Sequence, residues 1–149
     1  MSMKVTVLRG ISGAGKSTWV SRHAADAAVV SADHYFIVDG EYRFDASKLQ
    51  EHHGKCFRAF MDAIQSGTVS IVVDNTNIEA WEYSPYVIAA EAFGYEVELL
   101  TLDCTVEASL SRKALVNQKS LERMHAALVR ETDTMPKRFQ RIHRIEKTC

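Results

Sequence analysis

The stretch that most constrains this chain is GISGAGKST, residues 10–18. Between Gly10 and Ser17 it matches the pattern G-x-x-x-x-G-K-[ST], directly after an apolar run at 4–10 and ahead of helical spacing over 16–26. Glycines without a Cβ let such a loop wind with its amides pointing inward, and the N-terminus of the next helix adds partial positive charge. The pattern predicts a loop that binds the phosphates of a nucleotide. The alternative is a glycine-rich turn with an incidental lysine.

Three side chains of this loop have separate predicted roles. Lys16 is expected to reach the β- and γ-phosphates, Ser17 to help hold Mg²⁺ through its hydroxyl, and Thr18 to add a phosphate contact. ATP and Mg²⁺ are therefore the cofactors we expect. The residues predicted to bind the nucleotide from this loop are Ser12, Gly13, Ala14, Gly15, Lys16, Ser17 and Thr18.

Apolar strands alternate with helical segments along the whole chain. Strands are expected over 4–10, 27–33, 69–75 and 95–103, and helices over 16–26, 46–66, 78–93, 105–112 and 120–131. Because the strands are continuously apolar, we expect an α/β fold with a mostly parallel sheet and helices on both faces. The length of 149 residues favours one domain over 1–149.

The segments between these elements carry local signals. Asp39-Gly40 indicates a turn or small hairpin, and Asp45 is a candidate N-cap for the helix that follows. Ser84-Pro85 could restart a helix as N-cap and first helical residue. The basic tail, about 136–149, is expected to be partly helical over 137–147.

The second predicted strand ends at SADHYF, which puts Asp33 beside the phosphate-binding loop. Ligands of parallel α/β sheets bind at the carboxyl ends of the strands. A carboxylate there can orient and deprotonate an attacking hydroxyl, as the base of a kinase does. An N-cap or a distant magnesium ligand is the alternative role for Asp33.

The third predicted strand ends in DNTN, residues 74–77. Asp74 is expected to help hold Mg²⁺, through a water molecule. Asn75 and Asn77 could position an acceptor or help at the metal. Asn and Thr also favour turns and caps, so a purely structural role stays open for both.

A polar connector over about 111–124 is interpreted as a short lid. Its cations are Arg112, Lys113, Lys119 and Arg123. Phosphoryl transfer spreads negative charge over the γ-phosphate oxygens, and a lid that brings in one or two cations stabilises that charge. Arg112 is the first candidate for this catalytic role because it ends the helix after the fourth strand. Arg123 either contacts the nucleotide or is a solvated helix residue.

Composition and charge bound the function classes. No apolar run approaches the roughly 20 residues of a membrane span, and the N-terminus does not resemble a signal peptide, so we expect a cytoplasmic protein, in the host cytoplasm if the chain is viral. The cysteines Cys56, Cys104 and Cys149 are far apart and form no CxxC pair, which argues against a disulfide framework or a zinc site. Residues 112–149 hold 10 Lys and Arg against 4 Asp and Glu. This asymmetry indicates either a polyanionic partner or a solvated helical surface.

Taken together, GISGAGKST, SADHYF, GEYRFD and DNTN followed by WEYSPYV resemble the P-loop domain of polynucleotide 5′-kinase-like proteins, with the zeta-toxin and AAA_33-type kinases as neighbours. The similarity covers roughly 4–131. It implies a P-loop NTPase fold with a short helical lid, and an enzyme that transfers the γ-phosphate of ATP to a hydroxyl of a nucleic acid or nucleotide. It also implies Lys16 and Ser17 at ATP·Mg²⁺, Asp33 as general base, and lid arginines near Arg112.

One position departs from the family. The phage polynucleotide 5′-kinase has an arginine three residues beyond the catalytic aspartate, which grips the phosphate of the acceptor, and this chain has Phe36 there. The nearest substitute cation is Arg43. The residues expected to bind the acceptor are Tyr35, Phe36, Arg43, Asn75 and Asn77.

Several functions stay open at this level. The first is a kinase of polynucleotide 5′-hydroxyls, with DNA as partner in preference to RNA. Small phage kinases also resemble enzymes that phosphorylate the hydroxymethyl group of a modified pyrimidine in DNA, such as 5-hydroxymethyluracil, and an apolar wall at Phe36 would suit a flipped base. A nucleoside, nucleotide or sugar kinase is a third version. A non-catalytic nucleotide-binding switch or adaptor would need the loop but not Asp33. No membrane partner is expected, and the sequence does not indicate an oligomeric state.

Overall fold

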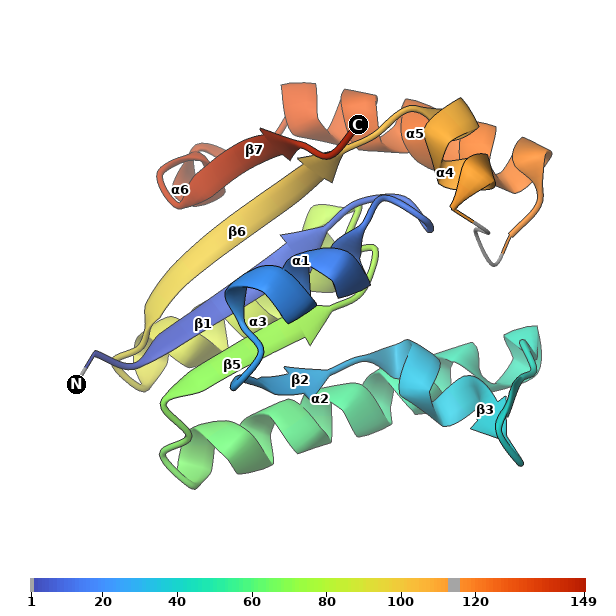
Figure 1. The fold of residues 1–149 in the computed structure, drawn as a ribbon. Helices are drawn as coiled ribbons and strands as arrows, with labels where there is room; N and C mark the ends of the chain where they lie inside the picture. The colour runs from blue at the N-terminus through green and yellow to red at the C-terminus, as the bar shows by residue number, and fades with distance from the viewer. Residues whose placement is uncertain (1, 113–115) are drawn as a thin grey trace.

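Five parallel strands form the main sheet of the computed structural model, which describes residues 2–112 and 116–149 (Figure 1). The order across the sheet is β2-β5-β1-β6-β7. The strands are β1 (Lys4–Arg9), β2 (Ala28–Val30), β5 (Ser70–Asp74), β6 (Glu96–Asp103) and β7 (His143–Lys147). The predicted α/β fold with a mostly parallel sheet is confirmed.

The first strand lies at the centre of this sheet. Val5 pairs with Ile71 of β5 on one side and with Val97 of β6 on the other. All three side chains are buried, as expected for a strand covered on both faces. The segment that follows β1 therefore emerges in the middle of the carboxyl edge of the sheet.

Helices cover both faces. The helices α2 (Leu49–Gln65) and α3 (Ala80–Ala92) pack on one face, together with the short α6 (Lys137–Gln140). The helices α1 (Lys16–His23), α4 (Val106–Ser111) and α5 (Gln118–Asp133) contribute to the core on the other face. Two 3₁₀ turns, η1 (Ala32–Phe36) and η2 (Ala46–Lys48), flank a hairpin of β3 (Ile37–Val38) and β4 (Glu41–Tyr42). The turn expected at Asp39-Gly40 is the turn of this hairpin.

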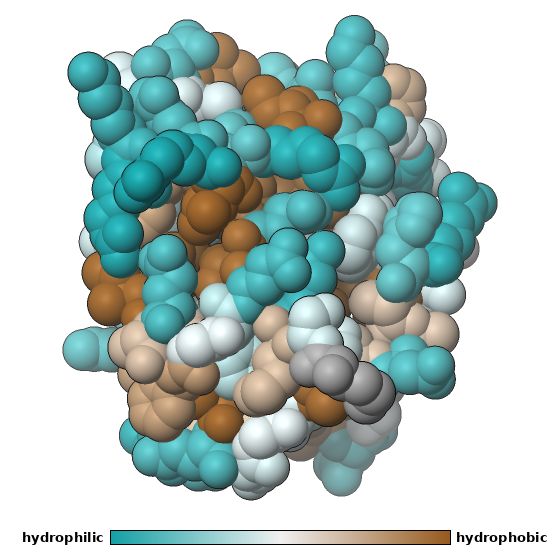
Figure 2. Space-filling model, turned by 90° about the vertical axis from the view of Figure 1, so that its left-hand side faces the viewer, coloured by the Kyte–Doolittle hydropathy of each residue, from teal (hydrophilic) through white to brown (hydrophobic). Residues whose placement is uncertain are grey.

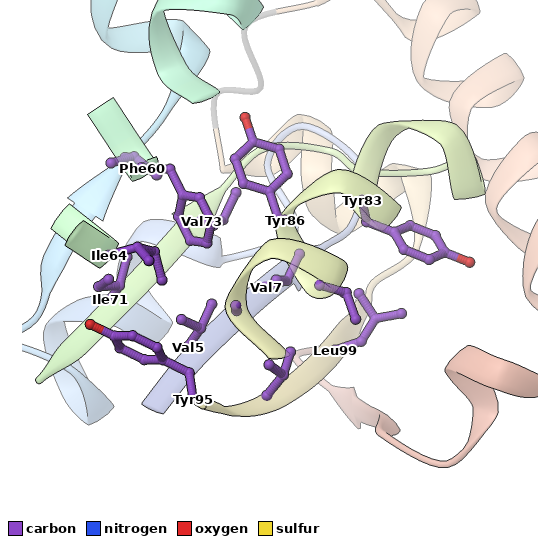
Figure 3. Close-up of a cluster of buried hydrophobic side chains, with 14 of the residues drawn as sticks. Val5, Val7, Phe60, Ile64, Ile71, Val73, Tyr83, Tyr86, Tyr95 and Leu99 are labelled. Carbon is purple, nitrogen blue, oxygen red and sulfur yellow. The ribbon is translucent and has the colours of Figure 1, made fainter. Parts of the chain in front are cut away.

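The core on the α2–α3 face joins aromatic side chains of the helices to aliphatic side chains of the strands (Figure 3). The rings of Phe60 and Tyr86 meet edge to face, with centroids 5.0 Å apart. Val7 and Leu99, from neighbouring strands, are completely buried in the same cluster. This packing fixes the two helices against the central strands, and with them the loops at the carboxyl edge.

Two segments differ from the sequence-based expectation. Pro85 does not restart a helix but lies inside α3, which begins with a capping box between Glu79 and Glu82. Pro85 is exposed, so the carbonyl that its ring leaves without a partner can be hydrated. The tail is helical only in α6 and then forms the edge strand β7. Arg144 of that strand pairs with Glu98 at 2.9 Å, so a charged segment is accommodated at the sheet edge.

The end of the molecule at which the N-terminus lies is shown in Figure 2. Hydrophilic side chains surround smaller apolar areas on this face. Within residues 2–112 and 116–149, no helix has the length and apolar character needed to cross a membrane.

Candidate active site

The loop between β1 and α1 winds through two glycines with positive φ. Gly13 has φ 80° and Gly15 has φ 95°, a region that residues with a Cβ rarely adopt. A Cβ at residue 15 would lie 2.9 Å from Nη1 of Arg112, so a side chain there would also displace this guanidinium. Gly15 is the N-cap of α1, and the loop therefore delivers its amides to the start of that helix.

The Lys16 ammonium folds back onto this loop. Its Nζ donates to the carbonyls of Gly10 at 3.1 Å and Ile11 at 3.0 Å. Burial lowers the pKa of Lys16, while the charges of Asp74 and Asp33 oppose that shift. A phosphate oxygen is a stronger acceptor for an ammonium than a carbonyl is, so the lysine is poised to exchange its loop contacts for an anion.

A central cavity of about 350 Å³ opens in front of the loop. The loop contributes Ser12, Gly13 and residues 15–18, and the other lining residues are Asp33, Asp74, Thr76 and Arg112. Two carboxylates, one ammonium and one guanidinium thus face one space. This is the charge arrangement that a magnesium-bound polyphosphate requires.

Oxygen donors in this cavity fit Mg²⁺. Burial raises the pKa of Asp74, Lys16 opposes that shift, and the neighbouring carboxylate of Asp33 adds to it. Within the described residues, no group of three or more His, Cys, Asp or Glu side chains could hold a metal alone. Mg²⁺ is usually bound through one or two carboxylates with water and substrate phosphates, and Ser17 and Asp74 suit that mode.

Asp33 is held from two elements. Ser31 at the end of β2 caps the turn η1, and its Oγ accepts a hydrogen bond from the Asp33 amide at 3.2 Å. The Tyr42 hydroxyl, from the hairpin, lies close enough to the Asp33 carboxylate to interact with it, and both residues line the hairpin-side cavity that is described below. Burial raises the pKa of Tyr42, and the Asp33 charge raises it further, so the phenol stays protonated as a donor.

Two further cavities adjoin the central one, on opposite sides. The β7-side cavity, about 420 Å³, shares Gly15, Thr18 and Arg112 with it. It extends to Trp19, Arg22 and His23 of α1 and its C-terminal end, and to Glu146, Lys147 and Thr148 at the end of β7.

The hairpin-side cavity, about 300 Å³, shares Ser12, Asp33 and Thr76 with the central cavity. Apolar and aromatic side chains form much of its lining, namely Tyr42, Phe44, Leu49, Val116 and Met124. Its further polar groups are His53, Asn75 and Glu82. No lysine or arginine within the described part of the chain lines it.

Arg112 links the central cavity to the segment that follows β7. Its Nη2 donates to the carbonyl of Thr148, and its Nη1 contacts the sulfur of Cys104 at 3.6 Å. The Thr148 hydroxyl donates to the carbonyl of Ala14 at 2.7 Å. Ala14 itself is fully buried under the loop. The guanidinium is therefore fixed beside the phosphate-binding loop before any ligand is bound.

Arg123 of the expected lid lies away from the central cavity. Arg123 is exposed on the first turns of α5, where its Nη2 donates to the Ser120 hydroxyl at 3.2 Å, and it does not line the three cavities. Lys113, with the segment 113–115 of the expected lid, lies outside the described residues.

The residues expected to bind an acceptor separate into two groups. Asn75 lines the hairpin-side cavity, although its Oδ1 also accepts from the Ala32 amide at 2.9 Å. Phe36 is buried, Tyr35 stacks beside Lys55, and Arg43 is exposed in an ion pair with Glu41. None of these last three lines the three described cavities.

Asn77 serves the backbone in this structure. It is buried with a positive φ of 48°, and its Nδ2 donates to the carbonyl of Leu8 at 2.8 Å. A second hydrogen bond joins the segment after β5 to the end of β1, since the Gly10 amide donates to the carbonyl of Thr76 at 3.0 Å. The rim after β5 is thus bonded directly to the root of the phosphate-binding loop.

A buried arginine, Arg9, supports the contact between the segment after β5 and the start of the phosphate-binding loop. Arg9 is completely buried, and its guanidinium donates to the carbonyls of Asn77 at 3.0 Å and Ile78 at 2.7 Å, and to the hydroxyls of Thr101 at 3.1 Å and Thr132 at 2.6 Å. It therefore joins β1, β6, the start of α3 and the end of α5 immediately before the loop.

Several side chains of the site were not found from the sequence. Tyr42, Phe44, His53 and Glu82 line the hairpin-side cavity, and Thr148 supports the loop. Tyr42 and Phe44 alternate in GEYRFD, which places both on one face of an extended segment, so that spacing was a usable signal. The others depend on tertiary packing.

These features define a P-loop kinase-like fold. Residues 5–142 match the family model AAA_33, described as an AAA domain, and the chain belongs to this family. The resemblance inferred from the motifs is thereby confirmed at the level of the family.

Known proteins of similar sequence or structure share only part of their length with this chain. NEDD4-binding protein 2 of Homo sapiens is 33% identical over 100 residues, which are 65% of this chain and 6% of that protein. A chain in the structure of the Pnkp1/Rnl/Hen1 RNA repair complex superposes with a TM-score of 0.72 at 15% identity, over 91% of this chain and 47% of that one. A gluconokinase from Sinorhizobium meliloti 1021 superposes with a TM-score of 0.58 at 13% identity, covering 98% and 83%.

Proposed function

We propose that this chain is an ATP-dependent kinase that transfers the γ-phosphate to a hydroxyl of a nucleic acid. The observation that carries the proposal is the position of Asp33, which lines both the central cavity and the hairpin-side cavity. A carboxylate at the junction of two cavities can accept a proton from a hydroxyl in one while the phosphate to be transferred lies in the other.

The three cavities suggest how the substrates would be arranged. The phosphates of ATP would occupy the central cavity, held by the loop amides, by Lys16 and by Thr18. Ser17 and Asp74 would hold Mg²⁺, which neutralises charge on the phosphates when bound. The nucleoside would extend into the β7-side cavity past Arg112, and the acceptor would enter the hairpin-side cavity.

The proposed reaction is an in-line transfer. Asp33, oriented by Ser31 and Tyr42, would take the proton of the acceptor hydroxyl as its oxygen attacks the γ-phosphorus. Lys16 and Arg112 would stabilise the negative charge that spreads over the transferred group. Arg123 remains a predicted nucleotide contact that would require movement of the lid.

The similar structures support phosphotransfer but differ in what they act on. One belongs to an RNA repair complex and another is a gluconokinase, so the shared fold does not select an acceptor. The nucleic-acid acceptor proposed here therefore depends on the combined motifs and on the basic segment 112–149, which would bind a polyanion in a salt-dependent manner.

A second candidate acceptor is the hydroxymethyl group of a modified pyrimidine in DNA. The hairpin-side cavity favours it, because Tyr42, Phe44 and Met124 offer apolar and aromatic surface to a planar ring. The 5′ end of a nucleic-acid strand would instead bring a negatively charged phosphate into this cavity. That phosphate would lack a cationic partner, since no lysine or arginine of the described residues lines the cavity.

Product analysis separates these candidates. The purified protein is incubated with γ-labelled ATP, Mg²⁺ and, in parallel, a 5′-hydroxyl oligonucleotide, DNA containing 5-hydroxymethyluracil, and free nucleosides. The proposal predicts label in a nucleic acid, and loss of that label in Asp33→Asn. If neither nucleic acid is labelled above the Asp33→Asn control, the proposed function is wrong.

A further inference from the structure

Two of the three cysteines meet at the end of the sheet, although they are 45 positions apart in the sequence. Cys104 directly follows β6 and is buried, whereas Cys149 follows β7 and is exposed. The parallel pairing of these strands ends with Asp103 opposite Lys147, so the two cysteines lie just beyond the last register pair. Both are free thiols, and they lie close enough for each to shift the pKa of the other.

The surroundings of the two sulfurs differ in a way that suits thiol chemistry. The sulfur of Cys149 accepts a hydrogen bond from the Thr105 amide at 3.2 Å. The contact with Cys104, the Thr105 amide and the Arg112 charge lower the pKa of the Cys149 thiol. Burial raises the pKa of the Cys104 thiol. An exposed thiol with a lowered pKa beside a buried thiol with a raised pKa is the arrangement of an attacking and a resolving cysteine.

This thiol pair borders the candidate nucleotide site. Arg112, which lines the central cavity, donates to the sulfur of Cys104 and to the carbonyl of Thr148. Thr148 precedes Cys149 and holds the phosphate-binding loop through the carbonyl of Ala14. A covalent change at Cys149 would therefore act on the residue that positions both the loop and Arg112.

We propose that Cys104 and Cys149 form a reversible disulfide on exposure to a peroxide, and that this bond weakens nucleotide binding. The Cys149 thiolate attacks a peroxide oxygen, the O–O bond breaks, and hydroxide leaves, which gives a sulfenic acid at Cys149. The Cys104 sulfur then gives up its proton and attacks the Cys149 sulfur, so that the S–S bond forms, the S–O bond breaks and water leaves. In total, two thiols and one hydrogen peroxide give one disulfide and two waters.

The expected effect on the nucleotide site follows from geometry. The two sulfurs must approach to about 2.05 Å to form a disulfide, which draws Cys149 and the neighbouring Thr148 toward Cys104. Thr148 would then lose its alignment with Ala14 and Arg112. Loss of one such hydrogen bond corresponds to roughly a three- to tenfold rise in the Kd of a bound nucleotide.

Peptide mapping tests the disulfide itself. The protein is treated at low concentration with equimolar hydrogen peroxide, alkylated, digested and analysed by mass spectrometry. We expect a bond between Cys104 and Cys149 within one chain, while the buried Cys56 stays free and serves as the internal control thiol. Cys104→Ser should leave a sulfenic acid at Cys149 that dimedone traps. A bond to Cys56, a bond between chains, or a Cys149 that passes directly to sulfinic acid would overturn the proposal.

Nucleotide binding tests the consequence, which rests on the proposed function. The Kd of a fluorescent ATP analogue with Mg²⁺ is measured for reduced protein, oxidised protein and oxidised protein treated with dithiothreitol, with Cys149→Ser as control. The Kd should rise on oxidation, return on reduction, and stay constant in Cys149→Ser. A formed disulfide with an unchanged Kd would refute the coupling. Reduced protein that binds no nucleotide would refute the proposed function instead, and the peptide map would still decide whether the disulfide forms.

Discussion

The Thr148 hydroxyl donates a 2.7 Å hydrogen bond to the carbonyl of Ala14, so the end of the last strand braces the phosphate-binding loop. Thr148→Val removes the donor and keeps the shape of the side chain. We expect the Kd for Mg·ATP to rise about three- to tenfold, the usual value of one hydrogen bond. Isothermal titration calorimetry measures this change. Thr148→Ser keeps the hydroxyl and should bind as the wild type does, and equal weakening in both variants would exclude the hydrogen bond as the cause.

The second prediction concerns Arg9, whose buried guanidinium bonds four different residues below the loop. Arg9→Met fills similar volume but leaves buried carbonyl and hydroxyl groups without their donor. We expect the free energy of unfolding to fall by about 3 kcal/mol, as measured by urea denaturation. Arg58→Met, on the exposed surface of α2, is the matched control and should change stability by less than about 0.5 kcal/mol. A loss at Arg9 no larger than at Arg58 would contradict this account.

The pKa of Asp74 gives a pH-dependent prediction. Burial raises this pKa, so the folded protein binds the proton more tightly than the unfolded chain does. The associated stability is present below the ordinary Asp pKa of about 4 and is lost as pH rises through the raised value.

Asp74→Asn removes this dependence and should be more stable than the wild type at neutral pH in the absence of nucleotide. The difference should vanish below about pH 4. Urea unfolding between pH 4 and 7.5 measures it, and Asp62→Asn on the exposed face of α2 provides the control. A variant that is less stable than the wild type at neutral pH would show that Asp74 is net stabilising. The more stable Asp74→Asn variant should also lose magnesium-dependent activity, because the carboxylate that would bind the cation destabilises the folded protein when no cation is bound.

The fourth prediction concerns Tyr42, whose hydroxyl interacts with the Asp33 carboxylate beside the hairpin-side cavity. Tyr42→Phe keeps the ring in the hairpin-side cavity and removes the group that orients the proposed base. We expect kcat for the phosphorylated acceptor to fall about three- to tenfold while the Kd for ATP is unchanged. Steady-state kinetics and nucleotide titration together test this. Tyr95→Phe also loses a hydrogen bond, to the carbonyl of Thr68, but outside the three cavities, and it should retain kcat.

The sequence predicted the order of strands and helices well because the strands are buried and apolar and the caps are local. Thr105 caps α4 as expected, since a threonine hydroxyl needs only the amide three residues on. The strand β7 was missed because HRIEK is charged. Its position depends on Glu98 of the neighbouring strand, which no local pattern could show.

The nucleotide side of the candidate site could also be predicted from the sequence, whereas the acceptor side could not. The motif at 10–18 lies in the central cavity together with Asp33, which follows β2, and Asp74, which ends β5, because parallel strands end at one edge. The acceptor side depends on which residues a hairpin and two helices bring together. Phe36 illustrates the difficulty: its place in the sequence suggested a substrate contact, but its ring packs against His52 with centroids 4.2 Å apart.

The place of β7 in the chain also matters during synthesis. The central strand β1 and the phosphate-binding loop leave the ribosome first, but the brace at Thr148 is made 134 residues later. A nascent chain can therefore pair its earlier strands while its nucleotide cleft still lacks one wall. The affinity for a nucleotide should therefore reach its full value only once Thr148 has followed β7 into place, so that tight binding reports that the edge strand is paired.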